Sequence, residues 1–192
     1  MERPRVRTFV AVELPDPQRR RLAEYLRDCS ARISGFRWTP EDNLHLTLRF
    51  LGGLEPPTFE RLRQRLEAVR HPSFDLGLSR LGTFGSGRRA RVLWLGVGEG
   101  GEALQTLAGA VDEACGVIGL SPPDHPFTAH LTLARARERG GSPLPSLDPP
   151  ELPAWRVERF VLFESRLGRP ASTYLPRARY RLGSSGGSGY TG

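Results

Sequence analysis

The sequence contains no lysine, because all 28 basic residues among its 192 residues are arginine. Without lysine the chain has no phosphate-binding loop of the G-x-x-x-x-G-K-[ST] type, since that loop holds the phosphates with its lysine. The same absence excludes Schiff-base catalysis and a nucleotidyl intermediate carried by lysine. Codon composition is one explanation of this bias, but the chemical consequence does not depend on the cause.

Acidic residues are too few to balance the arginines. The 21 Asp and Glu residues leave a formal net charge of +7, with a sequence pI of about 10.5. A positive field of this size favours an anionic partner. Guanidinium groups also form two-pronged hydrogen bonds to phosphate and stack on nucleobases. The charge therefore indicates an anionic ligand without identifying it.

Cysteine and long apolar runs are also scarce. Cys29 and Cys115 are too few for a disulfide framework and lack the spacing of a zinc site. No stretch approaches the ~20 apolar residues that span a membrane, and residues 1–5 offer no signal-peptide core. We therefore expect a cytoplasmic protein without a membrane segment and without a bound metal.

Apolar residues, 38% of the chain, recur with periods that predict a mixed α+β fold. Strands are expected at residues 8–14, 43–51, 74–81, 91–97, 128–134, 156–164 and 173–182. Helices are expected at residues 16–33, 56–69 and 102–118, and proline makes residues 140–153 a loop. Residues 1–182 are expected to form one bilobal domain with two interleaved lobes, followed by a flexible glycine- and serine-rich tail at 183–192.

One internal repeat stands out. The segment 43–48, Asn-Leu-His-Leu-Thr-Leu, resembles the segment 128–133, Thr-Ala-His-Leu-Thr-Leu, and each follows an amphipathic helix with a cysteine 15 or 16 residues before its histidine. Strand alternation places His45 with Thr47, and His130 with Thr132, on the polar face of each strand, while the leucines point to the core. We expect a duplicated lobe whose two strands face each other across a pseudo-two-fold axis.

Two imidazoles and two hydroxyls in one cleft suit a phosphodiester substrate. One neutral histidine can accept a proton from the nucleophile while a protonated one donates to the leaving oxygen. The hydroxyls of Thr47 and Thr132 can donate to the non-bridging phosphate oxygens. A single histidine on a strand is more often a structural residue, but two matched H-x-T strands favour catalysis. His71 and His125 have no such context, and His125 is read as a loop residue.

These motifs resemble the two-histidine phosphoesterases, specifically the RNA 2′,3′-cyclic phosphodiesterases, also called 2′-5′ RNA ligases. The resemblance covers about residues 5–182 and rests on the segments 9–15, 43–52, 91–96 and 127–135. The second motif carries Ala129 on the core-facing side, where the family often has proline. The resemblance implies a bilobal α+β fold with two antiparallel sheets around a central cleft and helices outside.

The resemblance also implies the chemistry. Family members open a 2′,3′-cyclic phosphate to a 2′-phosphate without metal, cofactor or ATP, and some join 2′-5′ linked RNA ends reversibly. His45 would then be the general acid and His130 the general base. An aromatic and an arginine, here Phe50 and Arg135, would lie around the nucleobase. Strict alternation would point both away from the catalytic face, but both lie where the strands are expected to end, so a bulge or a turn is expected to re-aim them.

An alternative follows if alternation holds. Phe50 would then be a core residue, Arg135 a phosphate ligand or surface charge, and Arg49 the better candidate for the anion. A separate hypothesis concerns the turn at residues 85–91, where Arg88 and Arg89 either track an RNA backbone or are a solvated hairpin tip.

We therefore expect a monomeric, metal-independent enzyme that takes RNA with 2′,3′-cyclic phosphate ends, or cyclic nucleotides. Three alternatives remain at this point. The first is a non-catalytic RNA-binding module that uses the same cleft. The second is a metal hydrolase that uses the four histidines, and the third is a two-histidine phosphodiesterase for another small cyclic phosphate.

Overall fold

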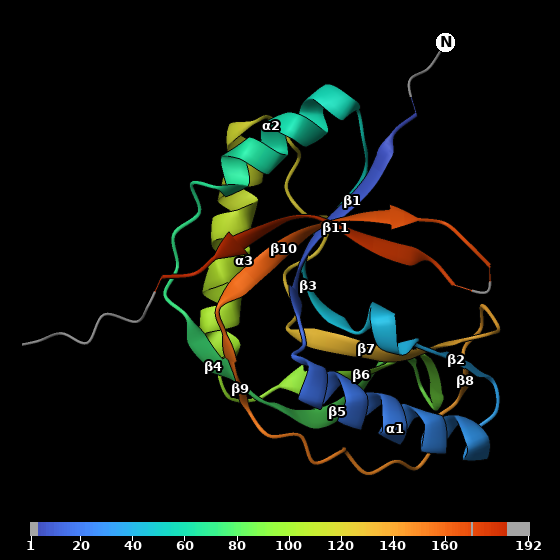
Figure 1. The fold of residues 1–192 in the computed structure, drawn as a ribbon. Helices are drawn as coiled ribbons and strands as arrows, with labels where there is room; N and C mark the ends of the chain where they lie inside the picture. The colour runs from blue at the N-terminus through green and yellow to red at the C-terminus, as the bar shows by residue number, and fades with distance from the viewer. Residues whose placement is uncertain (1–3, 170, 184–192) are drawn as a thin grey trace, which may run out of the picture.

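The computed structural model describes residues 4–169 and 171–183 (Figure 1). Three α-helices and a short 3-10 helix form: α1 Asp16–Arg32, η1 Glu41–Asn43, α2 Pro56–Leu66 and α3 Gly101–Val117. The strands are β1 Val6–Glu13, β2 Phe36–Trp38, β3 His45–Leu54, β4 Phe74–Leu76, β5 Leu78–Ser86, β6 Arg89–Val97, β7 His130–Ala136, β8 Ser142–Pro143, β9 Trp155–Val157, β10 Arg159–Arg166 and β11 Thr173–Arg181. Within this part of the chain, no helix has the length and apolar composition needed to cross a membrane.

The strands form two antiparallel halves that meet at the repeat. One half has the order β11-β10-β1-β3, and the other has the order β7-β6-β5, with β2 added to β7 and β8 to β6. The halves join through a single pair, Leu46 with Leu131, so the expected two sheets are continuous at this point. A separate two-stranded sheet pairs β4 with β9. The mixed α+β architecture with two related lobes is confirmed.

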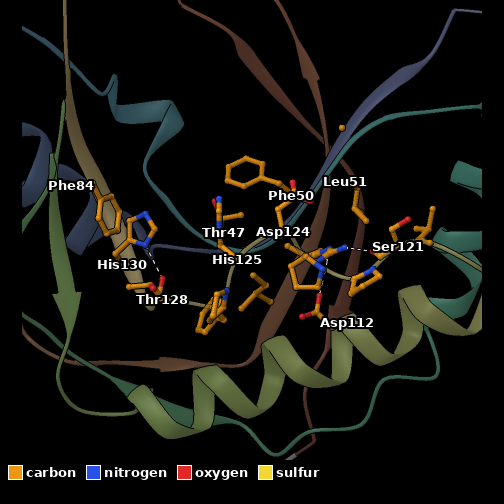
Figure 2. Close-up of a pocket in the computed structure, with 18 residues that line it drawn as sticks. Thr47, Phe50, Leu51, Phe84, Asp112, Ser121, Asp124, His125, Thr128 and His130 are labelled. Carbon is orange, nitrogen blue, oxygen red and sulfur yellow. Dashed lines mark hydrogen bonds and ion pairs between the residues drawn. The ribbon is translucent and has the colours of Figure 1, made fainter. Parts of the chain in front are cut away.

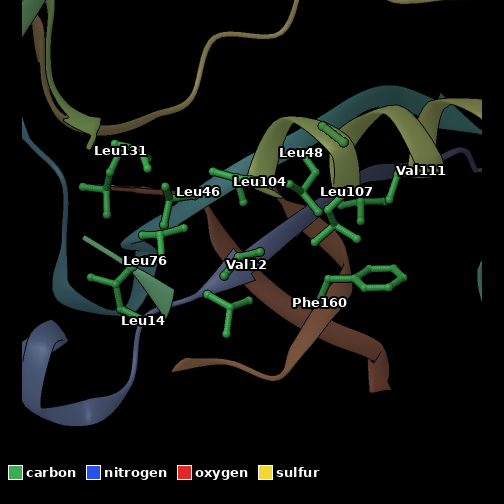
Figure 3. Packing of buried hydrophobic residues seen from close by; sticks show 14 of the residues in the cluster. Val12, Leu14, Leu46, Leu48, Leu76, Leu104, Leu107, Val111, Leu131 and Phe160 are labelled. Carbon is green, nitrogen blue, oxygen red and sulfur yellow. The ribbon is translucent and has the colours of Figure 1, made fainter. Parts of the chain in front are cut away.

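The leucines of the two H-x-T strands anchor them in the core. Leu46 and Leu131 are 1% and 0% exposed, and they belong to one cluster with Leu104 and Leu107 of α3 (Figure 3). Fully burying a leucine side chain contributes about 1.5–3 kcal/mol. The alternate residues of each strand therefore remain on the opposite face, where the polar side chains lie.

Three sequence expectations need correction. The strand expected at 74–81 is divided, because β4 pairs with β9 while β5 continues to Ser86 and pairs with β6. The connection between the strands expected at 74–81 and 91–97 is much shorter than expected, since β5 and β6 extend to its tip, where Gly87 has a φ of +60°. The loop at 140–153 contains β8, which pairs with β6.

The tail expected at 183–192 lies outside the described residues except for Gly183. This glycine is held by two backbone hydrogen bonds: its N–H donates to the carbonyl of His71 at 3.0 Å, and its carbonyl accepts from Ser73 at 2.7 Å. The ordered chain therefore includes the first residue of the expected tail.

Candidate active site

The central strand pair brings the two H-x-T motifs together. The strands β3 and β7 run antiparallel and pair at Leu46 and Leu131, and each of these leucines lies between the histidine and the threonine of its motif. The strands separate beyond this pair, so the four polar side chains lie on one face where the lobes meet. The predicted convergence of two imidazoles and two hydroxyls follows from this register.

A β-bulge follows each motif at the equivalent place. In β3, Arg49 pairs with Val10 and Thr47 pairs with Ala11, so Leu48 has no partner in β1. The extra residue reverses the alternation, and Phe50, 66% exposed, returns to the side of Thr47. The prediction that alternation fails before Phe50 is confirmed, but the strand does not end there, because β3 continues to Leu54.

The bulge in β7 has the same geometry. Ala134 pairs with Leu93 and Thr132 pairs with Trp94, which leaves Leu133 without a partner in β6. Ala134 is consequently buried, and Arg135 is exposed on the side of Thr132. Bulges re-aim the side chains that follow them. The two copies of the repeat therefore share both the H-x-T motif and the bulge directly after it.

Each histidine is oriented by a backbone carbonyl two residues earlier in the chain. The Nδ1 atom of His45 lies 2.7 Å from the carbonyl oxygen of Asn43, and Nδ1 of His130 lies 2.7 Å from that of Thr128. In the neutral ring Nδ1–H must be the donor in such a pair, so Nε2 carries the free lone pair. For His45, Nε2 lies 3.0 Å from the Thr47 hydroxyl, which donates to it. Both rings therefore present Nε2 for proton transfer.

Aromatic side chains support His45. Its ring lies 4.9 Å from the ring of Phe9 and 5.3 Å from that of Tyr174, which meets it edge-on at 89°. Phe9 lies in one of the segments on which the family resemblance rests. Nothing in the sequence indicated Tyr174, because its contact with His45 depends on where β11 lies in the fold. These contacts bury the imidazole and restrict its rotation.

His130 is supported by a second aromatic group. Its ring lies 5.1 Å from Phe84, again edge-on at 89°, and 6.1 Å from Trp94. The Trp94 ring lies against Gly82, where an added Cβ would be 2.1 Å from it. Gly82 and Trp94 are opposite each other in β5 and β6. A glycine opposite a tryptophan is the sequence signal that marks this support, and it was missed.

Burial makes both histidines weaker bases. Burial is the main cause that lowers the pKa of His45 from 6.5 to about 4; the positive charges of His130 and Arg135 act in the same direction, and the hydrogen bond to Asn43 opposes them. Burial also lowers the pKa of His130, again with a contribution from Arg135 and against its hydrogen bond to Thr128. The Arg135 charge therefore acts on both rings.

A cavity of about 860 Å³ borders this site (Figure 2). Thr47, Phe50 and His130 line one side of it, and the segment 120–128 lines the other. His125 belongs to that segment and is exposed, in agreement with its interpretation as a loop residue. Sequence reasoning did not identify this segment as a wall of the site, because its position depends on the packing of α3.

Arg49 lines the same cavity, but its side chain is engaged by the protein itself. Its side chain is 7% exposed, forms an ion pair with Asp112 of α3 at 3.5 Å, and donates a hydrogen bond to the carbonyl of Ser121. Burial raises the pKa of Asp112 despite the charge of Arg49. The alternative in which Arg49 binds the anion is therefore not supported, and Arg49 instead ties the cavity wall to β3.

Phe50 and Arg135 are not brought together. They lie beyond the Leu46–Leu131 pair in opposite directions, because β3 and β7 are antiparallel. Phe50 lines the large cavity, whereas Arg135 lines a second hollow of about 370 Å³. This geometry does not favour one base held between the two side chains. The charge of Arg135 acts on both imidazoles, which is compatible with the alternative in which it contacts phosphate.

Arg89 also differs from the expectation that it tracks RNA. Its side chain donates to the carbonyls of Gly140 and Gly141 and forms an ion pair with Glu138 at 3.3 Å. Arg88 is exposed at the hairpin tip. Across the described part of the chain, no three His, Cys, Asp or Glu side chains lie close enough together to hold a metal ion.

Comparison with known proteins agrees with this duplicated architecture. Residues 12–94 and 95–174 each match the family described as LigT like Phosphoesterase, so each match contains one H-x-T motif. The RNA 2′,3′-cyclic phosphodiesterase of Geobacillus stearothermophilus is 33% identical over 165 residues, which are 83% of this chain and 52% of that protein. The chain therefore spans about half the length of this relative.

Two further matches cover nearly whole proteins. The RNA 2′,3′-cyclic phosphodiesterase of Aeropyrum pernix is 34% identical over 174 residues, or 86% of this chain and 97% of that protein. The structure of Escherichia coli LigT complexed with 3′-AMP has a TM-score of 0.79 at 29% identity, and covers 93% of this chain and 98% of that one. The chain therefore belongs to the LigT-like phosphoesterase family and is an enzyme of its cyclic phosphodiesterase group.

Proposed function

We propose that the protein hydrolyses the 2′,3′-cyclic phosphate at RNA ends, or in cyclic nucleotides, to a 2′-phosphate by acid-base catalysis with His45 and His130. The observation that carries this proposal is the antiparallel pair of Leu46 and Leu131, which joins the two H-x-T strands at the leucine between the histidine and the threonine of each motif. Relatives named as RNA 2′,3′-cyclic phosphodiesterases support the substrate class.

In the proposed reaction His130 acts as the base. Its Nε2 accepts a proton from water, and the water oxygen forms a bond to phosphorus. The bond from phosphorus to O3′ breaks, and O3′ takes the proton from Nε2 of His45, which begins the reaction protonated. One proton enters and one leaves the protein, so exchange with solvent restores the starting state. Because the two motifs are nearly symmetric, the assignment of acid and base comes from the family resemblance.

The negative charge of the substrate favours protonation of His45, the proposed general acid. Without an anion, burial holds the pKa of His45 at about 4, so the ring is neutral at pH 7. A phosphate between the rings favours the imidazolium form, because an opposite charge within about 4–6 Å stabilises a charged group. Thr47, Thr132 and Arg135 donate to the non-bridging oxygens, whose negative charge increases toward the transition state. Substrate binding and protonation of the acid are therefore coupled.

Phe50 is the proposed platform for the terminal nucleobase. An exposed aromatic ring stacks on any base without reading its edge, and the large cavity beside it is lined mainly by apolar side chains.

The same catalytic groups would serve a 5′-hydroxyl in place of water. Because O3′ is the leaving group, that reaction forms a 2′-5′ linkage without ATP.

The test uses adenosine 2′,3′-cyclic phosphate in buffer with EDTA, with the product isomer identified by chromatography. We expect adenosine 2′-phosphate, and we expect His45→Gln and His130→Gln each to lose at least ~10²-fold in rate. His71→Gln is the matched control, because His71 lines neither cavity. A 3′-phosphate product would overturn the acid assignment. Turnover of His130→Gln at the wild-type rate would overturn the mechanism, and loss of activity in EDTA that a divalent metal restores would favour a metal hydrolase.

A further inference from the structure

The second hollow, of about 370 Å³, lies on β5, β6, β7 and the turn that follows β7. Three arginines line it: Arg91, Arg135 and Arg139. Phe84 and Glu138 lie on its wall as well. Arg135 is the only one of the three arginines that belongs to the site proposed above.

The three arginines are unpaired. None of them forms a hydrogen bond or ion pair with any residue of the described chain. The carboxylate of Glu138 is engaged by Arg89 at 3.3 Å, outside this group of three. Like charges gathered without partners repel each other, and this repulsion is relieved when an anion binds among them. The hollow therefore has the electrostatic character of a phosphate site.

A third bulge places Arg91 there. Phe84 pairs with Val92 and Gly85 pairs with Ala90, so Arg91 has no partner in β5. Ala90 is buried while Arg91 is exposed, which shows that the extra residue turns the arginine outward. Arg91 is thus the extra residue of a bulge, whereas Phe50 and Arg135 each follow one.

The hollow lies next to the large cavity, because the side chain of Phe84 lines both. The Phe84 ring also contacts that of His130 at 5.1 Å. Arg135 lines the hollow, and its charge lowers the pKa of both His45 and His130. An anionic chain bound with its end between the imidazoles can therefore pass Arg135 into the hollow.

We infer that Arg91 and Arg139 bind the phosphodiester that precedes the terminal cyclic phosphate, which makes an RNA chain, not a mononucleotide, the preferred substrate. This inference rests on the proposed function. A cyclic nucleoside phosphate has one phosphate, and Arg135 with the two H-x-T motifs occupies it. Only a longer RNA carries a second phosphate for the hollow. Arg91 and Arg139 are thus specificity residues for chain length.

The experiment compares two substrates, adenosine 2′,3′-cyclic phosphate and a short oligoadenylate that ends in a 2′,3′-cyclic phosphate. We expect Arg91→Gln and Arg139→Gln each to lower kcat/KM about tenfold for the oligonucleotide, the lower limit for a hydrogen bond to a charged group. For the mononucleotide we expect a change within about twofold. The salt dependence of oligonucleotide KM should weaken by about 0.7 in log–log slope for each arginine removed. Arg61→Gln is the matched control, since it removes one exposed arginine from α2.

The outcomes separate the two proposals. If the wild-type protein hydrolyses neither substrate, the proposed function fails and this inference fails with it. If it hydrolyses both with equal kcat/KM, or if Arg91→Gln and Arg139→Gln behave like Arg61→Gln, only the inference is overturned. Equal losses on both substrates also overturn it. Circular dichroism and thermal midpoints like those of the wild type establish that each variant is folded.

Discussion

Protonation of His45 should destabilise the folded protein in the absence of substrate. Burial lowers the pKa of this imidazole from 6.5 to about 4 in the folded chain. Above pH 6.5 the ring is neutral in both states and has no effect on the pH dependence of stability. Between pH 6.5 and pH 4 the unfolded chain takes up a proton that the folded chain does not, so unfolding becomes more favourable as the pH falls.

The size of this effect follows from the shift. One pKa unit corresponds to 1.36 kcal/mol, so the folded protein should lose about 3 kcal/mol from this group between pH 7 and pH 4. His45→Gln removes the titrating group and keeps a polar side chain of similar reach. The free energy of unfolding, measured in urea at both pH values, should therefore fall by about 3 kcal/mol less in the variant than in the wild type. Titrations of other groups occur in both proteins and cancel.

An NMR titration provides the independent measurement. The Cε1 proton resonance of His45 should titrate with a midpoint near 4, and inorganic phosphate in the cleft should raise this midpoint, because the anion favours imidazolium. If wild type and His45→Gln lose the same stability on acidification, or if the resonance titrates near 6.5, the imidazole is not desolvated as described. The argument for substrate-coupled protonation would then be refuted.

Three further predictions concern the site and its support. Thr47→Val and Thr132→Val keep the side-chain shape but remove a donor to the phosphate, so each should lower kcat/KM by about 10- to 150-fold; full activity in both would make the hydroxyls structural. Phe50→Ala should raise KM by about 5- to 150-fold through lost stacking, with little change among the four bases, and an unchanged KM would exclude the platform. Gly82→Ala should destabilise the protein by about 1–3 kcal/mol in urea unfolding, because its Cβ would lie 2.1 Å from the Trp94 ring; unchanged stability would mean that the ring moves freely.

The sequence by itself determined the local elements and the polar face of each H-x-T strand. Side chains on a strand point alternately to opposite faces, so leucines at alternate positions predict which face is buried without any knowledge of neighbouring strands. His45 and His130 could be identified in this way, as could the internal repeat and the family. The failure of alternation beside Phe50 was also expected, although for the wrong reason: the strand was expected to end there, whereas β3 continues to Leu54 and the bulge lies within it.

Only the tertiary structure decided which side chains meet. The antiparallel register at Leu46 and Leu131 sends Phe50 and Arg135 in opposite directions, and this register is set by pairing between segments 85 residues apart. Strand periodicity carries no information about the direction of a partner. The same limit explains why a single base between the two side chains was a reasonable expectation from the sequence and is not favoured by the fold.

Long-range packing also determined which groups each arginine side chain contacts. The bulge at Leu48 turns Arg49 toward Asp112 on α3, whereas the bulge at Arg91 turns that side chain into the basic hollow. Arg89, two residues away, is held by the segment after β7. In the sequence these residues are equivalent charges. Their roles differ because a charge acts through its surroundings, and the surroundings are supplied by parts of the chain that only the folded structure brings together.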